Sequence, residues 1–170
     1  MMKRDYNPTA EALRPEQMPA EMAAAARALE APIPKTLAVC ESMVNRDVLK
    51  NFLEGQSPGG APWTPRKRTP NPFHPLMRDT NALMNAATGF GPGHISENDG
   101  HTLVVGVDPG ASDEGGIPGA AAHNYGFYGV DSLGRNQKLP KREFEGARPD
   151  TEVRMAGVIA DGYLSEAGAF

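Results

Sequence analysis

The sequence has little of what metal and redox sites need. Cys40 is the only cysteine among 170 residues, so an internal disulfide and a multi-cysteine metal site are excluded. The four histidines form no His-Glu-x-x-His pair, and a zinc site needs three or four convergent ligands. We therefore expect no metal and no cofactor.

Long hydrophobic runs are also missing. No apolar run approaches the ~20 residues that cross a bilayer, and residues 1–5 lack the apolar stretch of a signal peptide. The Gly-rich segments 91–93 and 110–119 do not fit the Gly-x-x-x-x-Gly-Lys-Ser/Thr frame of a phosphate-binding loop. We expect no membrane contact and no enzyme activity, and a chain that stays in the cytoplasm until it joins a larger assembly.

Glycine and proline are abundant instead, with 19 and 16 residues, and the hydrophobic fraction is only 39%. Such a chain predicts much irregular structure and a thin core that gains stability against neighbours. The net charge of −4 gives no sign of wholesale nucleic-acid binding. We expect an N-terminal arm over residues 1–31 and a single domain over residues 32–170.

The strongest periodic signal is one apolar stripe at three- and four-residue steps, which predicts a helix of five to six turns ending near Gly55. Its members are Ile33, Leu37, Cys40, Val44, Val48 and Phe52. Because Cys40 lies on this stripe, we expect it to be a buried packing residue.

A loop rich in glycine and proline follows. Seven residues between Gly59 and Pro75 are Gly or Pro, which excludes helix and interior strand. Trp63 and Phe73 indicate that the loop is ordered and pinned by its aromatic side chains.

Later segments predict a short helix from Asp79 or Thr80 to Ala87, and a hairpin around the Asp-Gly pair at 99–100. They also predict a mobile loop over 110–119, a turn seated by the aromatics of 123–128, and a short strand at 138–140. A last helix begins at Pro149, and its expected apolar face consists of Val153, Ala156, Ile159 and Leu164. The fold class is therefore α+β: a long N-terminal helix packed on a small antiparallel sheet, a second C-terminal helix, and long Gly/Pro-rich loops.

The N-terminal arm contains an Ala-rich run, Ala20 to Ala31, with Met22, Ala26 and Leu29 at helical spacing. The run is short for a helix in isolation. It is either a helix that needs a partner surface or a frayed, solvated helix.

Four motifs occur in an order that resembles the phage virion morphogenesis family, whose members act as tail completion or head–tail joining proteins. The motifs are Gly60-Ala61-Pro62-Trp63-Thr64-Pro65, Leu76-Met77-Arg78-Asp79-Thr80-Asn81-Ala82-Leu83, His123-Asn124-Tyr125-Gly126 and Pro140-Lys141-Arg142-Glu143-Phe144-Glu145-Gly146. The resemblance covers residues 33 to 165. It departs from the family pattern at Asn81, where the family usually has Gly.

The resemblance implies a structural, non-enzymatic protein of the phage virion, in its neck or tail, that forms a ring around the DNA channel and joins head to tail. It implies a hexamer or dodecamer whose partners are portal, adaptor or tail tube proteins. It does not decide between tail terminator, stopper and adaptor. Contact with genomic double-stranded DNA would be weak and blind to sequence.

Interface residues are expected in the motifs and loops of the resemblance. They are Trp63, Arg66, Lys67, Arg68, Phe73, His123, Tyr125 and Phe144. Arg66, Lys67 and Arg68 are either a DNA contact or a solvated loop tip. Two alternatives stay open: a connector adaptor that touches DNA through this basic loop, and a small hydrolase with His123 as its base rather than as a structural, hydrogen-bonded residue.

Overall fold

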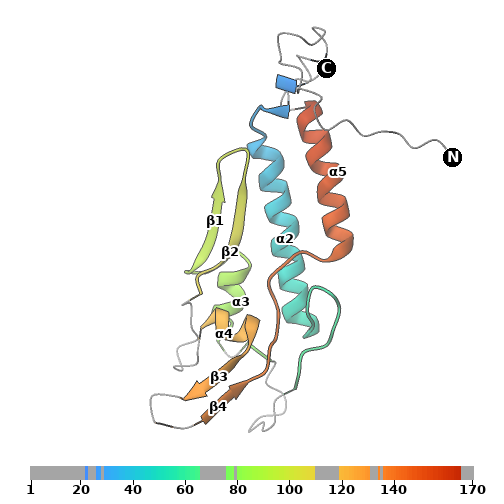
Figure 1. Ribbon diagram of the computed structural model, residues 1–170. Helices are drawn as coiled ribbons and strands as arrows, with labels where there is room; N and C mark the ends of the chain where they lie inside the picture. The colour runs from blue at the N-terminus through green and yellow to red at the C-terminus, as the bar shows by residue number, and fades with distance from the viewer. Residues whose placement is uncertain are drawn as a thin grey trace, which may run out of the picture.

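The fold combines helices with small sheets. The computed structural model describes residues 22, 26–27, 29–65, 76–78, 80–109, 119–130, 134 and 136–165. Over these residues it has four helices and two two-stranded antiparallel sheets (Figure 1), which confirms a mixed helix-and-sheet fold, whereas the sequence predicted one sheet. The helices are α2 (Pro34–Glu54), α3 (Ala82–Ala87), α4 (Ala120–Tyr125) and α5 (Pro149–Ser165), and the strands are β1 (His94–Asn98), β2 (Leu103–Val107), β3 (Phe127–Val130) and β4 (Asn136–Leu139).

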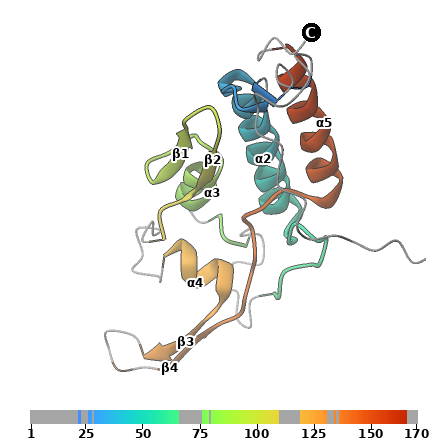
Figure 2. The same ribbon diagram turned by 45° about the horizontal axis from the view of Figure 1, so that its top comes forward.

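Helix α2 is the central element. Pro34 stands in its first turn, where a missing N–H costs nothing, and Gly55 ends it with a left-handed φ of 66°. The predicted stripe is confirmed, since Ile33, Cys40 and Phe52 are among its buried members. Figures 1 and 2 show β1 and β2 on one side of α2 and α5 on the other.

The first sheet is the predicted hairpin. Strands β1 and β2 pair from His94 with Val107 to Asn98 with Leu103. Gly100 in the turn has a φ of 90°, and its carbonyl oxygen accepts a hydrogen bond of 2.8 Å from the backbone N–H of Ile33. A Cβ on Gly100 would come within 2.6 Å of the Pro32 side chain, so this turn and the start of α2 pack closely.

The second sheet and α4 differ from the sequence expectation. Residues 120–125 form helix α4 rather than a lead into a turn, because the alanines favour helix and Gly126, with a φ of 82°, ends it. The strand expected at 138–140 is β4, and it pairs with β3 rather than with the first hairpin. Figure 2 shows this β3–β4 ribbon extending away from α4.

Helix α5 begins at Pro149 as predicted, but three of the four residues of its expected apolar face are exposed, and only Ile159 is half-buried. Val153 is 75% exposed and Leu164 is 49% exposed, whereas the buried positions are Thr151 and Gly162. Small residues at the buried positions allow α5 to approach α2 closely, and α2 covers only one side of α5. The side of α5 that carries Val153 and Leu164 therefore points away from α2, whereas Met155, Val158 and Ile159 lie half-buried on the side of Thr151 and Gly162.

The core lies where α2, α3 and β2 meet the irregular segments that hold Trp63, Met77 and Phe144. None of the described helices is both long and apolar enough to span a membrane. Most of the predicted N-terminal arm and nearly all of the predicted loop over 110–119 lie outside the described residues.

Gly162 provides a test of the packing between α2 and α5. A Cβ at Gly162 would overlap the Thr36 side chain on α2, so Gly162→Ala should lower the free energy of unfolding by roughly 1–3 kcal/mol. The measurement is urea unfolding at low protein concentration.

The matched control is Gly157→Ala on the same helix. No atom lies within 4 Å of a Cβ built there, so this change should raise the free energy of unfolding by about 0.5–1 kcal/mol. Equal effects of the two substitutions would contradict the close α2–α5 contact.

Candidate functional site

The candidate site is built around an irregular segment, residues 140–148, which we call the strap. It runs from the end of β4 to the start of α5 without helix or strand. A backbone without secondary structure must find its hydrogen bonds elsewhere when it is buried. Along the strap, these bonds come from side chains and from backbone groups far away in the sequence.

An aromatic cluster fixes the middle of the strap. Phe144 is fully buried, and its ring centroid lies 5.1 Å from that of Phe52 on α2. Phe52 also meets Trp63 edge-to-face, with centroids 5.6 Å apart and an angle of 84° between the rings. The indole Nε1 of Trp63 donates a hydrogen bond of 2.9 Å to the carbonyl oxygen of Glu143. The only Trp of the chain thus anchors the strap by packing and by a hydrogen bond.

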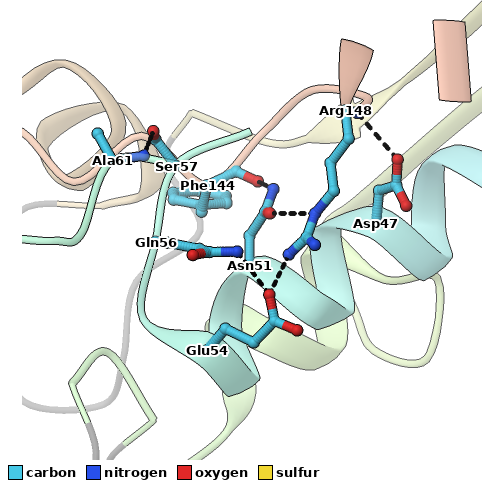
Figure 3. Close-up of polar contacts among 8 residues, drawn as sticks. All are labelled: Asp47, Asn51, Glu54, Gln56, Ser57, Ala61, Phe144 and Arg148. Atoms are coloured by element: carbon cyan, nitrogen blue, oxygen red, sulfur yellow. Dashed lines mark hydrogen bonds and ion pairs between the residues drawn. The ribbon is translucent and has the colours of Figure 1, made fainter. Parts of the chain in front are cut away.

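Asn51 on α2 holds the middle and the C-terminal end of the strap (Figure 3). Its Nδ2 donates a 3.1 Å hydrogen bond to the carbonyl oxygen of Phe144, and its Oδ1 accepts one of 3.2 Å from Nε of Arg148. The side chain is completely buried. A buried amide uses both of its ends here, so truncating it leaves two partners unsatisfied.

Two acidic residues of α2 complete the contacts of Arg148 (Figure 3). Oδ2 of Asp47 accepts a 2.9 Å hydrogen bond from the backbone N–H of Arg148, and Oε2 of Glu54 pairs with Nη2 at 2.5 Å. Asp47 therefore places a carboxylate beside the first turn of α5, where the helix dipole favours negative charge.

Asn124 of α4 holds the other side of the strap. Its Oδ1 accepts the backbone N–H groups of Phe144 at 2.9 Å and Glu145 at 3.4 Å. Its Nδ2 donates to Oε2 of Glu145 at 3.3 Å, and Oε1 of the same carboxylate accepts the backbone N–H of Val107 at 3.1 Å. Burial raises the pKa of Glu145, against the lowering effect of the Val107 hydrogen bond. The strap is thereby tied to α4 and to β2.

Arg142 ties the strap to the Trp63 loop and to the end of α4. Its Nε donates a hydrogen bond of 3.0 Å to the carbonyl oxygen of Thr64. Its backbone N–H donates one of 2.8 Å to the carbonyl oxygen of His123. The side chain is 6% exposed, although arginine is usually a surface residue. Arg142 is thus a structural residue of this junction.

The predicted interface residues fall into three groups. Trp63 and Phe144 are buried in the core beside the strap, so their side chains are occupied within the chain. His123 lies in the last turn of α4 and reaches the strap through its carbonyl oxygen, whereas Tyr125 is 71% exposed. Arg66, Lys67, Arg68 and Phe73 lie outside the described residues, so the DNA contact stays a prediction.

A Gly-x-Ser-x-Gly frame occurs at residues 55–59, the spacing of a hydrolase nucleophile elbow. The elbow needs a strand before the serine and a helix after it, whereas this frame follows the C-terminus of α2 and leads into a loop. The hydroxyl of Ser57 accepts the backbone N–H of Ala61 at 3.2 Å. The serine stabilises a turn, and the geometry does not support a nucleophile.

A shallow hollow of about 420 Å³ lies on α2 beside the turn before β1. In it, Nδ1 of His94 lies 2.9 Å from the carbonyl oxygen of Ala86, and Nε2 lies 3.4 Å from Oε1 of Glu41. Among the described residues, no group of three or more His, Cys, Asp or Glu side chains could hold a metal ion. Ser42 also lines the hollow, and its hydroxyl donates a 3.1 Å hydrogen bond to the carbonyl oxygen of Ala38.

Comparisons with models of known protein families, with curated proteins and with solved structures found no match for this chain.

Sequence reasoning missed the polar residues that hold the strap. Asp47, Asn51 and Glu54 recur at helical spacing next to the apolar stripe of α2, and this polar row is the signal that could have found them. Nothing local identifies their partner, because Phe144 lies 93 residues after Asn51.

Asn51→Ala tests the strap. The change leaves the Phe144 carbonyl and Arg148 Nε without their buried partner, so the free energy of unfolding should fall by roughly 2–3 kcal/mol. Lys50→Ala, an exposed neighbour on the same helix, should stay within about 0.5 kcal/mol of wild type. Urea unfolding measures both, and similar losses in the two variants would contradict the role of Asn51.

Glu145 predicts a pH dependence of stability. Because its pKa is raised in the folded state, the folded chain binds this proton more tightly than the unfolded chain does. The stability that this residue contributes is complete below the unfolded pKa and is lost as pH rises through the folded pKa. Glu145→Gln removes this titration, so its stability relative to wild type should increase from pH 4 to pH 7 in urea unfolding. A relative stability that decreases over this range would show the opposite sign.

Proposed function

We propose that this chain is a structural protein of a tailed-phage virion that joins head to tail as part of a ring around the DNA channel. The observation that carries the proposal is where the four motifs of the resemblance lie. Although they are spread over residues 60 to 146, all four contribute to one buried junction. We infer that the motifs maintain a fold rather than a catalytic site.

Each motif has a packing role at this junction. The first supplies Trp63, and the second supplies the core residues Met77 and Leu83. The third supplies Asn124 and then Gly126, where a Cβ would lie 3.1 Å from the backbone nitrogen of Lys141. The fourth motif is most of the strap itself. Shared packing roles are what a family of structural proteins would preserve.

The departure at Asn81 is compatible with the family pattern. Asn81 has a φ of 60°, in the left-handed region that glycine adopts freely and that asparagine tolerates better than other residues. A Gly in the family and an Asn here satisfy the same backbone requirement at the start of α3.

The finer parts of the proposal follow the family arrangement. They are a long helix on a small sheet, a second helix at the C-terminus, and Gly/Pro-rich loops that contact neighbouring subunits. Ring subunits meet through head-to-tail interfaces, in which two different surfaces of one chain bind each other. The exposed β3–β4 ribbon, with Tyr128 at 82% exposure, and the outer side of α5 are surfaces available for such contacts.

Deleting the gene from the phage that carries it tests the proposal. Without the joining protein, electron micrographs of infected cells should show filled heads and separate tails, and plasmid-borne wild-type protein should restore joined, infectious particles. Asn51→Ala protein should restore fewer particles, because it unfolds more readily. Joined particles in the complete absence of the protein would overturn the proposal.

A further inference from the structure

Helix α5 carries an apolar face that is exposed in the described part of the chain, which we call the outer stripe. Its members are Val153, Ala156, Gly157, Ala160 and Leu164, and all five are exposed. Their spacing of three and four residues places them on one side of the helix, opposite Thr151 and Gly162, which face α2. In Figures 1 and 2, α5 lies at the edge of the fold with α2 on one side only.

The composition of the outer stripe favours a helix as its partner. Alanine and glycine in its middle let another helix backbone approach closely, and Val153 and Leu164 flank them. Gly157 weakens the helix, and no atom lies within 4 Å of a Cβ built there, so contacts within the described chain do not explain this glycine.

A second apolar row with exposed members occurs in the same chain. Met22, Ala26 and Leu29 recur at helical spacing in the Ala-rich segment 20–31, and Met22 and Leu29 are 54% and 63% exposed. A 12-residue helix is marginal in water unless its apolar face is covered. The segment would extend about 18 Å as a helix, close to the roughly 17 Å between the ends of the outer stripe.

We propose that the outer stripe is the docking site for segment 20–31 of a second copy of this chain. The proposal deepens the proposed function and rests on it, because it names the contact by which subunits of the ring would join. Each copy would donate its segment to one neighbour and accept the segment of another. Such a contact is heterologous and closes into a ring when the rotation between copies permits.

The start of α2 explains why the donor is a second copy. The backbone N–H of Ile33 is bound to Gly100 at the β1–β2 turn, and Pro32 packs on the same glycine. Helix α2 lies between this turn and α5 (Figure 1). Two residues of chain from Ile33 back to Ala31 span only about 7 Å, less than the ~10 Å width of one helix. To lie along its own outer stripe, the segment would have to start beside the β1–β2 turn and first cross α2.

Self-association of the full-length chain is the first test, measured by sedimentation or light scattering over a range of concentrations. Ala160→Glu places a charge in the middle of the outer stripe and should weaken self-association at least about tenfold. Ala38→Glu makes the same change at an exposed position of α2 and should leave it unchanged. A wild-type chain that stays monomeric at every concentration, or equal effects of the two variants, would overturn the docking.

Crosslinking between two variants identifies the occupant. Ala26 and Ala160 both lie near the middle of their segments, so they meet whether the helices run parallel or antiparallel. Mixing Ala26→Cys chains with Ala160→Cys chains under oxidising conditions should give a disulfide-linked dimer, whereas Ala26→Cys mixed with Arg154→Cys, beside the stripe, should give far less. Cys40 is buried, so it does not compete. A monomeric double variant that forms the bond within one chain would overturn the choice of a second copy.

These outcomes are separable from the proposed function. If the chain self-associates but Ala160→Glu has no effect, the docking site is wrong and the joining role stands. If the crosslink forms but phage lacking the gene still joins heads to tails, the docking site is right and the proposed function is wrong. If Ala160→Glu abolishes binding to a portal or tail protein while self-association is unchanged, the occupant is that protein and not a second copy.

Discussion

The fold depends on how the strap is held, because this irregular segment joins α4 to α2 and β2, with which α4 otherwise makes few contacts. The buried amide of Asn51 joins the strap to α2, and Asn124 joins it to α4. A buried backbone carbonyl or N–H without a partner costs free energy comparable to a lost hydrogen bond, so each of these amides stabilises a segment that secondary structure does not. The aromatic contact of Phe144 with Phe52 excludes water from these bonds and strengthens them.

This junction also explains how a chain with a thin core stays ordered. A hydrophobic fraction of 39% leaves few side chains to bury, and the described core is confined to the region around α2 and the strap. The β3–β4 ribbon and the outer side of α5 lie beyond it, with large exposed apolar side chains such as Tyr128 and Val153. Two-stranded ribbons are marginal alone, so these parts gain most from neighbouring subunits. A protein that completes its packing on assembly is consistent with the role that we propose.

Polar residues in or next to the motifs of the resemblance bond to groups of the same chain. The charged groups of Arg142 and Arg148 point to carbonyl, amide and carboxylate oxygens of the same chain. Ser57 lies in a Gly-x-Ser-x-Gly frame but holds a turn after a helix. Side chains committed to such bonds are not available for substrate, and their loss is expected to appear as lower stability before it appears as lost activity.

The sequence by itself determined the elements whose signals are local: the apolar stripe and the Gly55 end of α2, the hairpin around Gly100, and the start of α5 at Pro149. Periodicity and turn chemistry act over a few residues, so they can be read without knowing the path of the chain. Only the tertiary structure decided that Asn51 meets Phe144, that β4 pairs with β3, and which face of α5 is buried. These outcomes depend on contacts between distant segments, since a helix face is buried by whatever lies beside it. On α5 the side next to α2 holds Gly162 and the half-buried Ile159, whereas Val153, Ala156 and Leu164 of the expected apolar face are exposed.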